Sequence, residues 1–306
     1  MTLKKWVDIK GDFTDALLLG NGFSIEFHKG FEYSNLWESA KYEGFIGDEI
    51  DELAGIFSIA PNFEHLLRKL YTAEVVNKHL NINEVLIQEA YEKLRKALIE
   101  TVRKVHCKHN DISERLEEPI PFLKNFKTIF SLNYDLLIYW MILIDINNKT
   151  GHPFRDCFNK NRFEYNWEIY RTPYDYETNR TLVFYPHGAL HLMQTKEEID
   201  EKIIAEGSTL LETIIGQWNK DTCLPLFVSE GNSEKKMQFI RRSKYLSTIY
   251  HEILPKSGPT LVIMGWSMDI KVDAHILKQI GKGNYEKIAI AVHRKTQKGI
   301  ETFIDE

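Results

Sequence analysis

The chain has 306 residues, of which 43% are hydrophobic and 12% aromatic, enough to bury the core of one large domain or two modest ones. A formal net charge of −5 argues against a strongly basic surface, so nucleic acid is not expected to be the main ligand. Three widely spaced cysteines without a C-x-x-C pair argue against a disulfide framework and a structural zinc site. No apolar stretch approaches the roughly 20 residues that span a bilayer, and we expect a cytoplasmic protein.

Short apolar runs separated by helical patterns predict the fold class. The runs lie at residues 16–20, 126–132, 181–188, 225–231, 260–266 and 287–293. Apolar runs without polar alternation are typical of strands buried on both faces of a parallel sheet. Between them, apolar residues recur at helical spacing, as in Phe63, Leu66, Leu67 and Leu70. This alternation predicts a doubly wound, mainly parallel α/β sheet of the Rossmann type with helices on both faces.

Two segments interrupt the alternation. Residues 42–118 contain at least two successive helical patterns and no strand pattern, which predicts a helical insertion. Residues 147–180 are polar, aromatic and rich in turn residues, and are expected to form a lid or a small irregular or β-rich module. Because no repeat or long linker divides the chain, we expect residues 1–306 to form a single domain with insertions.

The first predicted strand ends at Gly20-Asn21-Gly22. Two glycines allow a tight turn and a close approach of the backbone to a ligand, and amides at the start of the following helix suit a phosphate or pyrophosphate. The alternative is a plain strand-to-helix turn, since the third glycine of the G-x-G-x-x-G pattern is missing.

Polar residues also follow three other predicted strands, where ligands bind to open α/β sheets. Asn133 and Asp135 suit ribose hydroxyls or a bound water, or they cap the next helix. His187 precedes Gly188 and could accept a proton from a hydroxyl or water, or serve a structural role. A further turn contains Gly265, Ser267 and Asp269, and Ser267 or Asp269 could cap a helix or bind a second sugar. The final predicted strand ends at Val292 and His293, which are a candidate wall for a base.

The order of these motifs along the chain resembles the sirtuin fold: a glycine loop first, then Asn-x-Asp, His-Gly and Gly-x-Ser. More specifically, it resembles the zinc-less, sirtuin-like NAD hydrolase domains of bacterial anti-phage defence, such as those of Thoeris-type systems. The resemblance covers about residues 16–293. It implies that Asn133 and His187 are catalytic. It also implies that Gly20, Asn21, Gly22, Ser24, Asp135, Gly265 and Ser267 bind NAD. We add Phe23, within the glycine loop, and Val292, at the end of the last strand, to the predicted NAD-binding residues.

The sequence departs from sirtuin deacetylases in three respects. Deacetylases carry a four-cysteine zinc module, which a chain with three cysteines cannot build, so the resemblance implies no metal and argues against deacylation. The segment KGFEYSNLW replaces their proline-containing loop, and Phe31 or Tyr33 becomes a candidate wall of the nicotinamide pocket. Phe23 and Trp266 are bulkier than the residues common at their positions.

The resemblance implies cleavage of NAD to nicotinamide and ADP-ribose by an abortive-infection effector, with NAD as substrate. Such an enzyme must be held inactive in its host, and the last predicted strand ends close to Glu306. We therefore expect control through homo-oligomer assembly or a defence partner protein encoded nearby. A non-catalytic subunit that binds NAD or ADP-ribose, an ADP-ribosyl transferase, a deacylase and a preference for NADP remain open alternatives.

Overall fold

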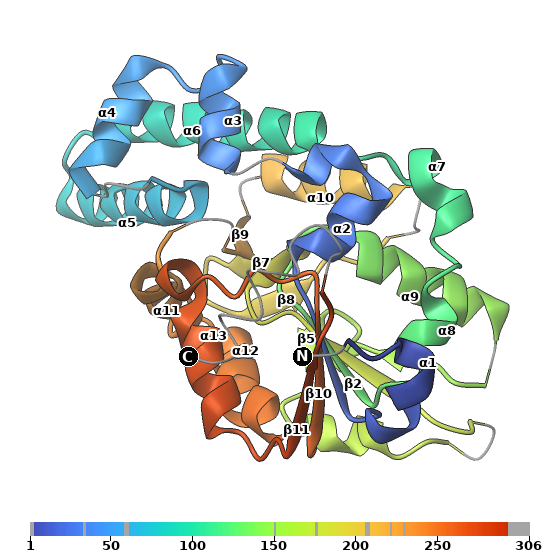
Figure 1. The fold of residues 1–306 in the computed structure, drawn as a ribbon. Coiled ribbons are helices and arrows are strands. Elements are labelled where there is room, and N and C mark those ends of the chain that lie inside the picture. Colours follow the sequence, from blue (N-terminus) through green and yellow to red (C-terminus); the bar gives the residue numbers. More distant parts are fainter. Residues whose placement is uncertain are drawn as a thin grey trace.

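The computed structural model describes residues 3–32, 35–57, 61–149, 151–174, 177–205, 209–220, 222–228 and 231–292. Strands from both halves of the chain form two sheets, and helices surround them (Figure 1). The Tyr33 and His293 positions singled out in the sequence lie outside the described residues.

A six-stranded sheet forms the centre of the fold. Its order is β11-β10-β1-β2-β6-β3, and every pairing in it is parallel. The strands are β1 (Ala16–Leu19), β2 (Thr128–Ser131), β3 (Phe154–Arg155), β6 (Thr181–Phe184), β10 (Thr260–Met264) and β11 (Lys287–Ile290). All residues of β1, β2 and β6 are buried, as expected for strands covered on both faces. The prediction of a mainly parallel α/β sheet is confirmed.

The predicted strand at residues 225–231 was wrongly assigned to this sheet. It forms β9 (Cys223–Phe227) in a second sheet of order β4-β5-β8-β7-β9, whose pairings are antiparallel. The other members are β4 (Phe158–Asn159), β5 (Arg162–Phe163), β7 (Gly188–Thr195) and β8 (Asp200–Lys202). Only residues 185–187 separate β6 from β7, too few for a crossover to a parallel neighbour. Pro225 lacks an amide hydrogen and fits the edge position of β9.

Helices lie on both sides of the parallel sheet. In Figure 1, α12 and α13 lie on one side of β10, and α8 and α9 lie on the other. The helices along the chain are α1 (Trp6–Ile9), α2 (Asn21–Phe27), α3 (Leu36–Tyr42), α4 (Asp48–Phe57), α5 (Phe63–Leu80), α6 (Val85–Val105), α7 (His109–Ile112), α8 (Ile120–Leu123), α9 (Leu137–Asn148), α10 (Leu210–Asn219), α11 (Ser233–Ile240), α12 (Lys244–Thr248) and α13 (Ile270–Lys282). No helix within the described ranges is both long enough and apolar enough to cross a bilayer.

The two segments that interrupt the sequence pattern behave differently. Within the described part of residues 42–118 there are helices and no strand, and α3 to α6 lie together at one end of the molecule (Figure 1). Residues 147–180 instead supply strands to both sheets, β3 to the first and β4 and β5 to the second. This segment is therefore part of the framework, because its short strands pair with β6 and β8.

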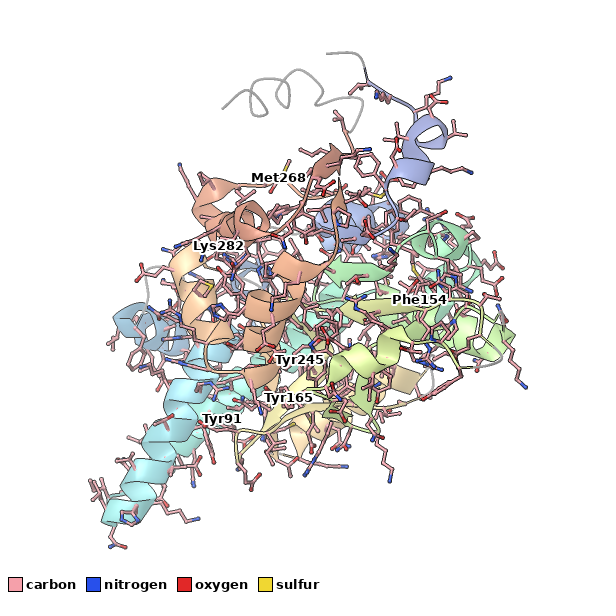
Figure 2. The ribbon with its side chains drawn as sticks, turned by 90° about the horizontal axis from the view of Figure 1, so that it is seen from below. Tyr91, Phe154, Tyr165, Tyr245, Met268 and Lys282 are labelled. Carbon is pink, nitrogen blue, oxygen red and sulfur yellow. The ribbon has the colours of Figure 1, made fainter. Side chains whose placement is uncertain are left out.

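Aromatic side chains join the second sheet to the helices beside it. The ring centroids of Phe163 and Tyr245 are 4.9 Å apart, and Phe163 also contacts Tyr165 at 5.2 Å. Tyr165 and Tyr245, both labelled in Figure 2, thus pack on the same phenylalanine. Phe163 reaches Phe184 of β6 as well, at 6.5 Å, so this aromatic cluster connects the two sheets.

Candidate functional site

A cavity of about 400 Å³ opens at one edge of the parallel sheet. Its walls come from the segments that follow the carboxyl ends of four adjacent strands, β10, β1, β2 and β6. From β1 the chain proceeds to β2 on one side, whereas β10 pairs on the other side, so the strand order reverses between β1 and β10. A crevice beyond such a reversal is where open α/β sheets bind ligands.

The glycine loops after β1 and β10 pack directly against each other. A Cβ on Gly20 would lie 2.5 Å from the Cα of Trp266, and a Cβ on Gly265 would lie 2.5 Å from the amide nitrogen of Phe23. The Gly22 amide donates to the Gly265 carbonyl oxygen at 2.7 Å. The glycines are thus explained by contact between two loops, whereas the sequence predicted a close approach to a ligand.

The amides at the start of α2 are largely engaged within the protein. Besides the Gly22 amide, the Phe23 amide donates to the Gly20 carbonyl oxygen at 3.0 Å. In the described part of the chain, no backbone acceptor is found for the Asn21 amide, which therefore remains available to an anion. The predicted phosphate cradle is therefore smaller than two glycines suggest.

Asn133 is held by its amide group in the wall of the cavity. It is 7% exposed, and its Nδ2 donates to the Gly20 carbonyl oxygen at 3.0 Å and to Ser24 Oγ at 2.8 Å. Both amide hydrogens are thereby used. Among the described residues no donor to Asn133 Oδ1 is found, so this oxygen is the atom left for a ligand or a water.

Ser24 links Asn133 to Asp135. The Ser24 hydroxyl accepts from Asn133 and donates to Asp135 Oδ2 at 2.5 Å, while Asp135 Oδ1 accepts from the Leu137 amide at 2.9 Å. Burial raises the pKa of Asp135, although its hydrogen bonds with Ser24 and Leu137 oppose that shift. Asp135 thus accepts from the first amide of α9, although the N-cap of that helix is Leu136. Asp269 is the N-cap of α13 and accepts from the Lys271 amide.

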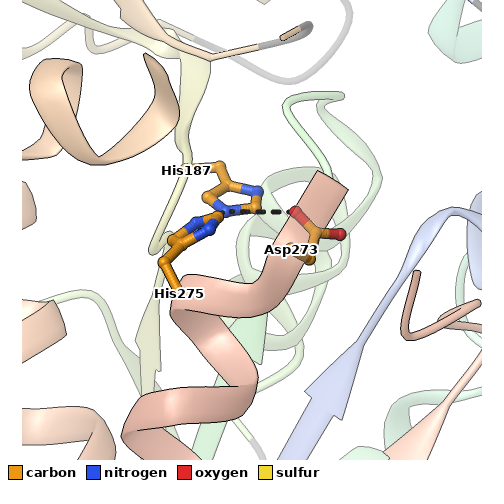
Figure 3. A group of neighbouring side chains, drawn as sticks. All are labelled: His187, Asp273 and His275. Atoms are coloured by element: carbon orange, nitrogen blue, oxygen red, sulfur yellow. Dashed lines mark hydrogen bonds and ion pairs between the residues drawn. The ribbon is translucent and has the colours of Figure 1, made fainter. Parts of the chain in front are cut away.

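His187 faces two residues of α13. Its Nε2 lies 2.8 Å from His275 Nε2 and 3.9 Å from Asp273 Oδ1, and the three side chains converge in Figure 3. Burial lowers the pKa of His187 well below its usual value, and the positive charge of Lys236 lowers it further against the opposing effect of Asp273. The imidazole is therefore neutral near pH 7 and has a lone pair.

A buried ion pair lies beside this histidine. Lys236 Nζ is 2.8 Å from Asp273 Oδ1, and Trp266 Nε1 donates to Asp273 Oδ2 at 2.9 Å. Burial by itself raises the pKa of Asp273, but the charge of His187, once that ring is protonated at low pH, and the charge of Lys236 outweigh it and lower the pKa to about 2. Asp273 is ionised, and its charge is balanced by Lys236.

The donor atoms of His187, Asp273 and His275 lie within 4.8 Å of one another, and two imidazoles with one carboxylate suit a transition metal. Two features favour a hydrogen-bonded network instead. The Lys236 ammonium already neutralises the Asp273 oxygen that would bind the metal, and the two imidazole nitrogens are at hydrogen-bond distance from each other. We therefore assign no metal to this cluster.

A family model described as a domain of unknown function (DUF4917) matches residues 17–304. The chain belongs to the DUF4917 family. No curated protein sequence matches it significantly. The DUF4917 match includes every residue that lines the cavity, from Gly20 to Asp273, so the cavity lies wholly within the family domain.

Most of the residues selected from the sequence converge on the cavity. Its lining includes Gly20, Asn21, Gly22, Phe31, Asn133, Asp135, His187, Gly265, Trp266 and Ser267. Phe23 and Ser24 are buried behind the lining, where Phe23 packs on Phe27 and Ser24 joins Asn133 to Asp135. Val292 follows β11, at the edge of the sheet, and is absent from the described lining.

Sequence reasoning missed Lys236, Asp273 and His275. Lys236 lies on α11, and the other two lie on α13 between apolar residues that predict only a packing helix. A weak signal was available, because Asp273 and His275 lie only 8 and 10 positions after Gly265, in the helix that follows this turn. Nothing in the sequence places this helix against His187, since Asp273 lies 86 positions after His187 in the chain.

Proposed function

We propose that this protein hydrolyses NAD at the nicotinamide glycosidic bond, and that its sheet is of the doubly wound, sirtuin-like type. The observation that carries the proposal is the presence of the Asn133 carboxamide and the His187 imidazole in the walls of one cavity, at the carboxyl ends of adjacent parallel strands. A cavity of about 400 Å³ lies within the range of small-molecule sites.

The proposed reaction needs positioning more than acid catalysis. Nicotinamide leaves NAD as a neutral molecule from a cationic pyridinium, so its departure requires no proton. The protein must hold the ribose as positive charge develops on it, exclude bulk water and admit one oriented water. Polar side chains that are buried and held by hydrogen bonds, such as Asn133, suit this task.

Asn133 is proposed to orient the attacking water. Its two amide hydrogens are bound by Gly20 and Ser24, which leaves the carbonyl oxygen as an acceptor of fixed direction. A water that donates a hydrogen to Oδ1 directs its lone pair toward the ribose carbon. Ser24 and Asp135 then act indirectly, since they hold the carboxamide in place.

His187 is proposed to accept a hydrogen bond from a ribose hydroxyl, or to accept the proton of the attacking water. Both roles require a neutral imidazole, and burial maintains that form. The ionised Asp273, 3.9 Å away, would stabilise an imidazolium formed during the reaction. Trp266 and Phe31 provide partly apolar walls for the two ends of a dinucleotide.

The test is release of nicotinamide from NAD by the purified protein, followed for the wild type and for Asn133→Ala and His187→Ala. Loss of a positioned proton acceptor typically costs about 10²–10⁴-fold in rate, and we expect losses of this size in both variants. His251→Ala is the matched control, because this histidine lines a different groove. NAD that remains bound and intact with the wild type, or undiminished turnover in both variants, contradicts the proposal.

We also propose that turnover depends on assembly with a second copy or with a partner. Exposed apolar side chains gather at the α5–α6 turn, where Leu80, Ile82, Val85 and Leu86 are 58%, 51%, 52% and 79% exposed. Such a group favours a contact surface. Specific activity should therefore rise with protein concentration or on addition of the partner, and constant activity in dilute monomer contradicts this part of the proposal.

A further inference from the structure

A chain of hydrogen bonds extends from His187 away from the proposed reaction site. His187 Nε2 contacts His275 Nε2 at 2.8 Å, and His275 Nδ1 contacts Ser233 Oγ at 3.1 Å. The His275 backbone amide also donates to Ser233 Oγ at 2.8 Å. Both ring nitrogens of His275 therefore have partners, and its ring is held from two directions.

This chain crosses the wall between two hollows of the protein. His187 lines the central cavity, whereas His275 and Ser233 line a separate groove of about 490 Å³ between α11 and α13. His251 and Gln279 also line that groove. Since His275 is 3% exposed, it lies within the wall, between the two hollows.

The contact between the two imidazoles couples their protonation states. Burial lowers the pKa of His275 to about 4, so both rings are neutral near pH 7. Two neutral imidazole nitrogens at 2.8 Å share one proton, which one ring donates and the other accepts. A backbone hydrogen bond with Leu132 also acts on His187, so the tautomer of His187 is set by Leu132 together with the ring of His275.

We propose that His275 is a positioning residue for His187, which fixes the orientation of its ring and, together with Leu132, determines which ring nitrogen carries the proton, and that Ser233 holds His275 in turn. The activity part of this inference rests on the proposed role of His187 in NAD cleavage. The tautomer part does not, because it concerns the imidazole before any substrate binds.

Another histidine of the same chain shows the arrangement expected for packing alone. His191 is fully buried and stacks on Tyr139 with ring centroids 4.4 Å apart. In the described part of the chain, neither of its ring nitrogens has a hydrogen-bond partner. His275 differs because polar groups meet both of its ring nitrogens, and a purely apolar ring could not replace those contacts.

The first experiment compares NAD turnover of His275→Phe, which keeps an aromatic ring without a polar edge, with His275→Gln, which keeps a side-chain amide that can donate or accept. Misplacement of a catalytic group by about 1 Å costs on the order of 10²-fold, so we expect kcat to fall by about 10–100-fold in the Phe variant with little change in KM. The Gln variant should recover most of the loss. His251→Phe, in the same groove, should match the wild type.

The second experiment reads the His187 ring directly by ¹⁵N NMR at neutral pH without NAD. One tautomer is expected in the wild type, and a mixture in His275→Phe. Should that variant not fold, Ser233→Ala serves instead and should also broaden the tautomer distribution.

The outcomes separate the two proposals. An unchanged His187 spectrum in the folded variants, or a rise in activity, overturns the positioning role. A changed spectrum in a protein that never cleaves NAD supports the positioning role and overturns only the proposed function.

Discussion

Replacement of Gly265 by alanine tests the contact between the two glycine loops. Gly265 has a φ of +69°, in the left-handed region, and an added Cβ would lie 2.5 Å from the Phe23 amide nitrogen. The left-handed conformation costs a non-glycine residue about 1–2 kcal/mol. Relief of an overpacked contact typically costs about 1–3 kcal/mol more, and here the neighbour is backbone that cannot rotate away. We expect Gly265→Ala to lower the free energy of unfolding by about 2–5 kcal/mol.

Gly281 provides a control with the opposite expected sign. It lies in α13, and outside its own helix no heavy atom within the described residues comes within 4 Å of its added Cβ. Alanine in a helix is favoured over glycine by roughly 0.5–1 kcal/mol, so Gly281→Ala should raise the free energy of unfolding by about that amount.

Urea unfolding followed by tryptophan fluorescence measures both variants. Because the Gly265 loop also forms the cavity wall, Gly265→Ala should weaken NAD binding as well, whereas Gly281→Ala should not. A Gly265→Ala protein as stable as the wild type would refute the explanation of these glycines by loop contact. Equal destabilisation by both substitutions would refute it too.

Three further predictions concern the buried polar groups. Ser24→Ala removes both a donor and an acceptor from the cavity network and should cost about 2–4 kcal/mol of stability by urea unfolding, together with most NAD turnover; an unaffected protein would exclude the linking role of this hydroxyl. Lys236→Met leaves the buried Asp273 carboxylate without its cation and should cost about 3–5 kcal/mol at pH 7. The pKa of Asp273 is about 2 in the folded state against 3.8 unfolded. The difference in free energy of unfolding between the wild type and Lys236→Met should therefore be present above pH 4 and shrink as the pH falls toward 2. A difference that stays constant over this interval would contradict the role of the ionised Asp273. Burial lowers the pKa of His106 from 6.5 to about 4, so the stability that its neutral form contributes above pH 6.5 is lost as the pH falls toward 4. In urea unfolding at a series of pH values, the free energy of unfolding of His106→Gln should therefore decline less over this interval than that of the wild type.

The sequence alone determined the parts of this protein that depend on neighbouring residues. Apolar runs at residues 16–20, 126–132, 181–188, 260–266 and 287–293 identified five strands of the parallel sheet, because burial on both faces selects uninterrupted apolar residues. The polar residues after four of these strands could be grouped into one site, since carboxyl ends of parallel strands meet at one edge.

Pairing between distant segments was decided only by the tertiary structure. The run at residues 225–231 looks like its parallel counterparts, and only its pairing with β7 places it in the second sheet. Gly20 and Gly265 read as ligand-binding positions, yet their nearest atoms belong to each other's loops.

The environment of His187 was likewise invisible in the sequence. Lys236, Asp273 and His275 reach it from α11 and α13, and local patterns in those helices report only which face is apolar. The physical reason is the same in each case: periodicity and turn chemistry are local properties, whereas hydrogen bonds and charges act between residues that the fold brings together.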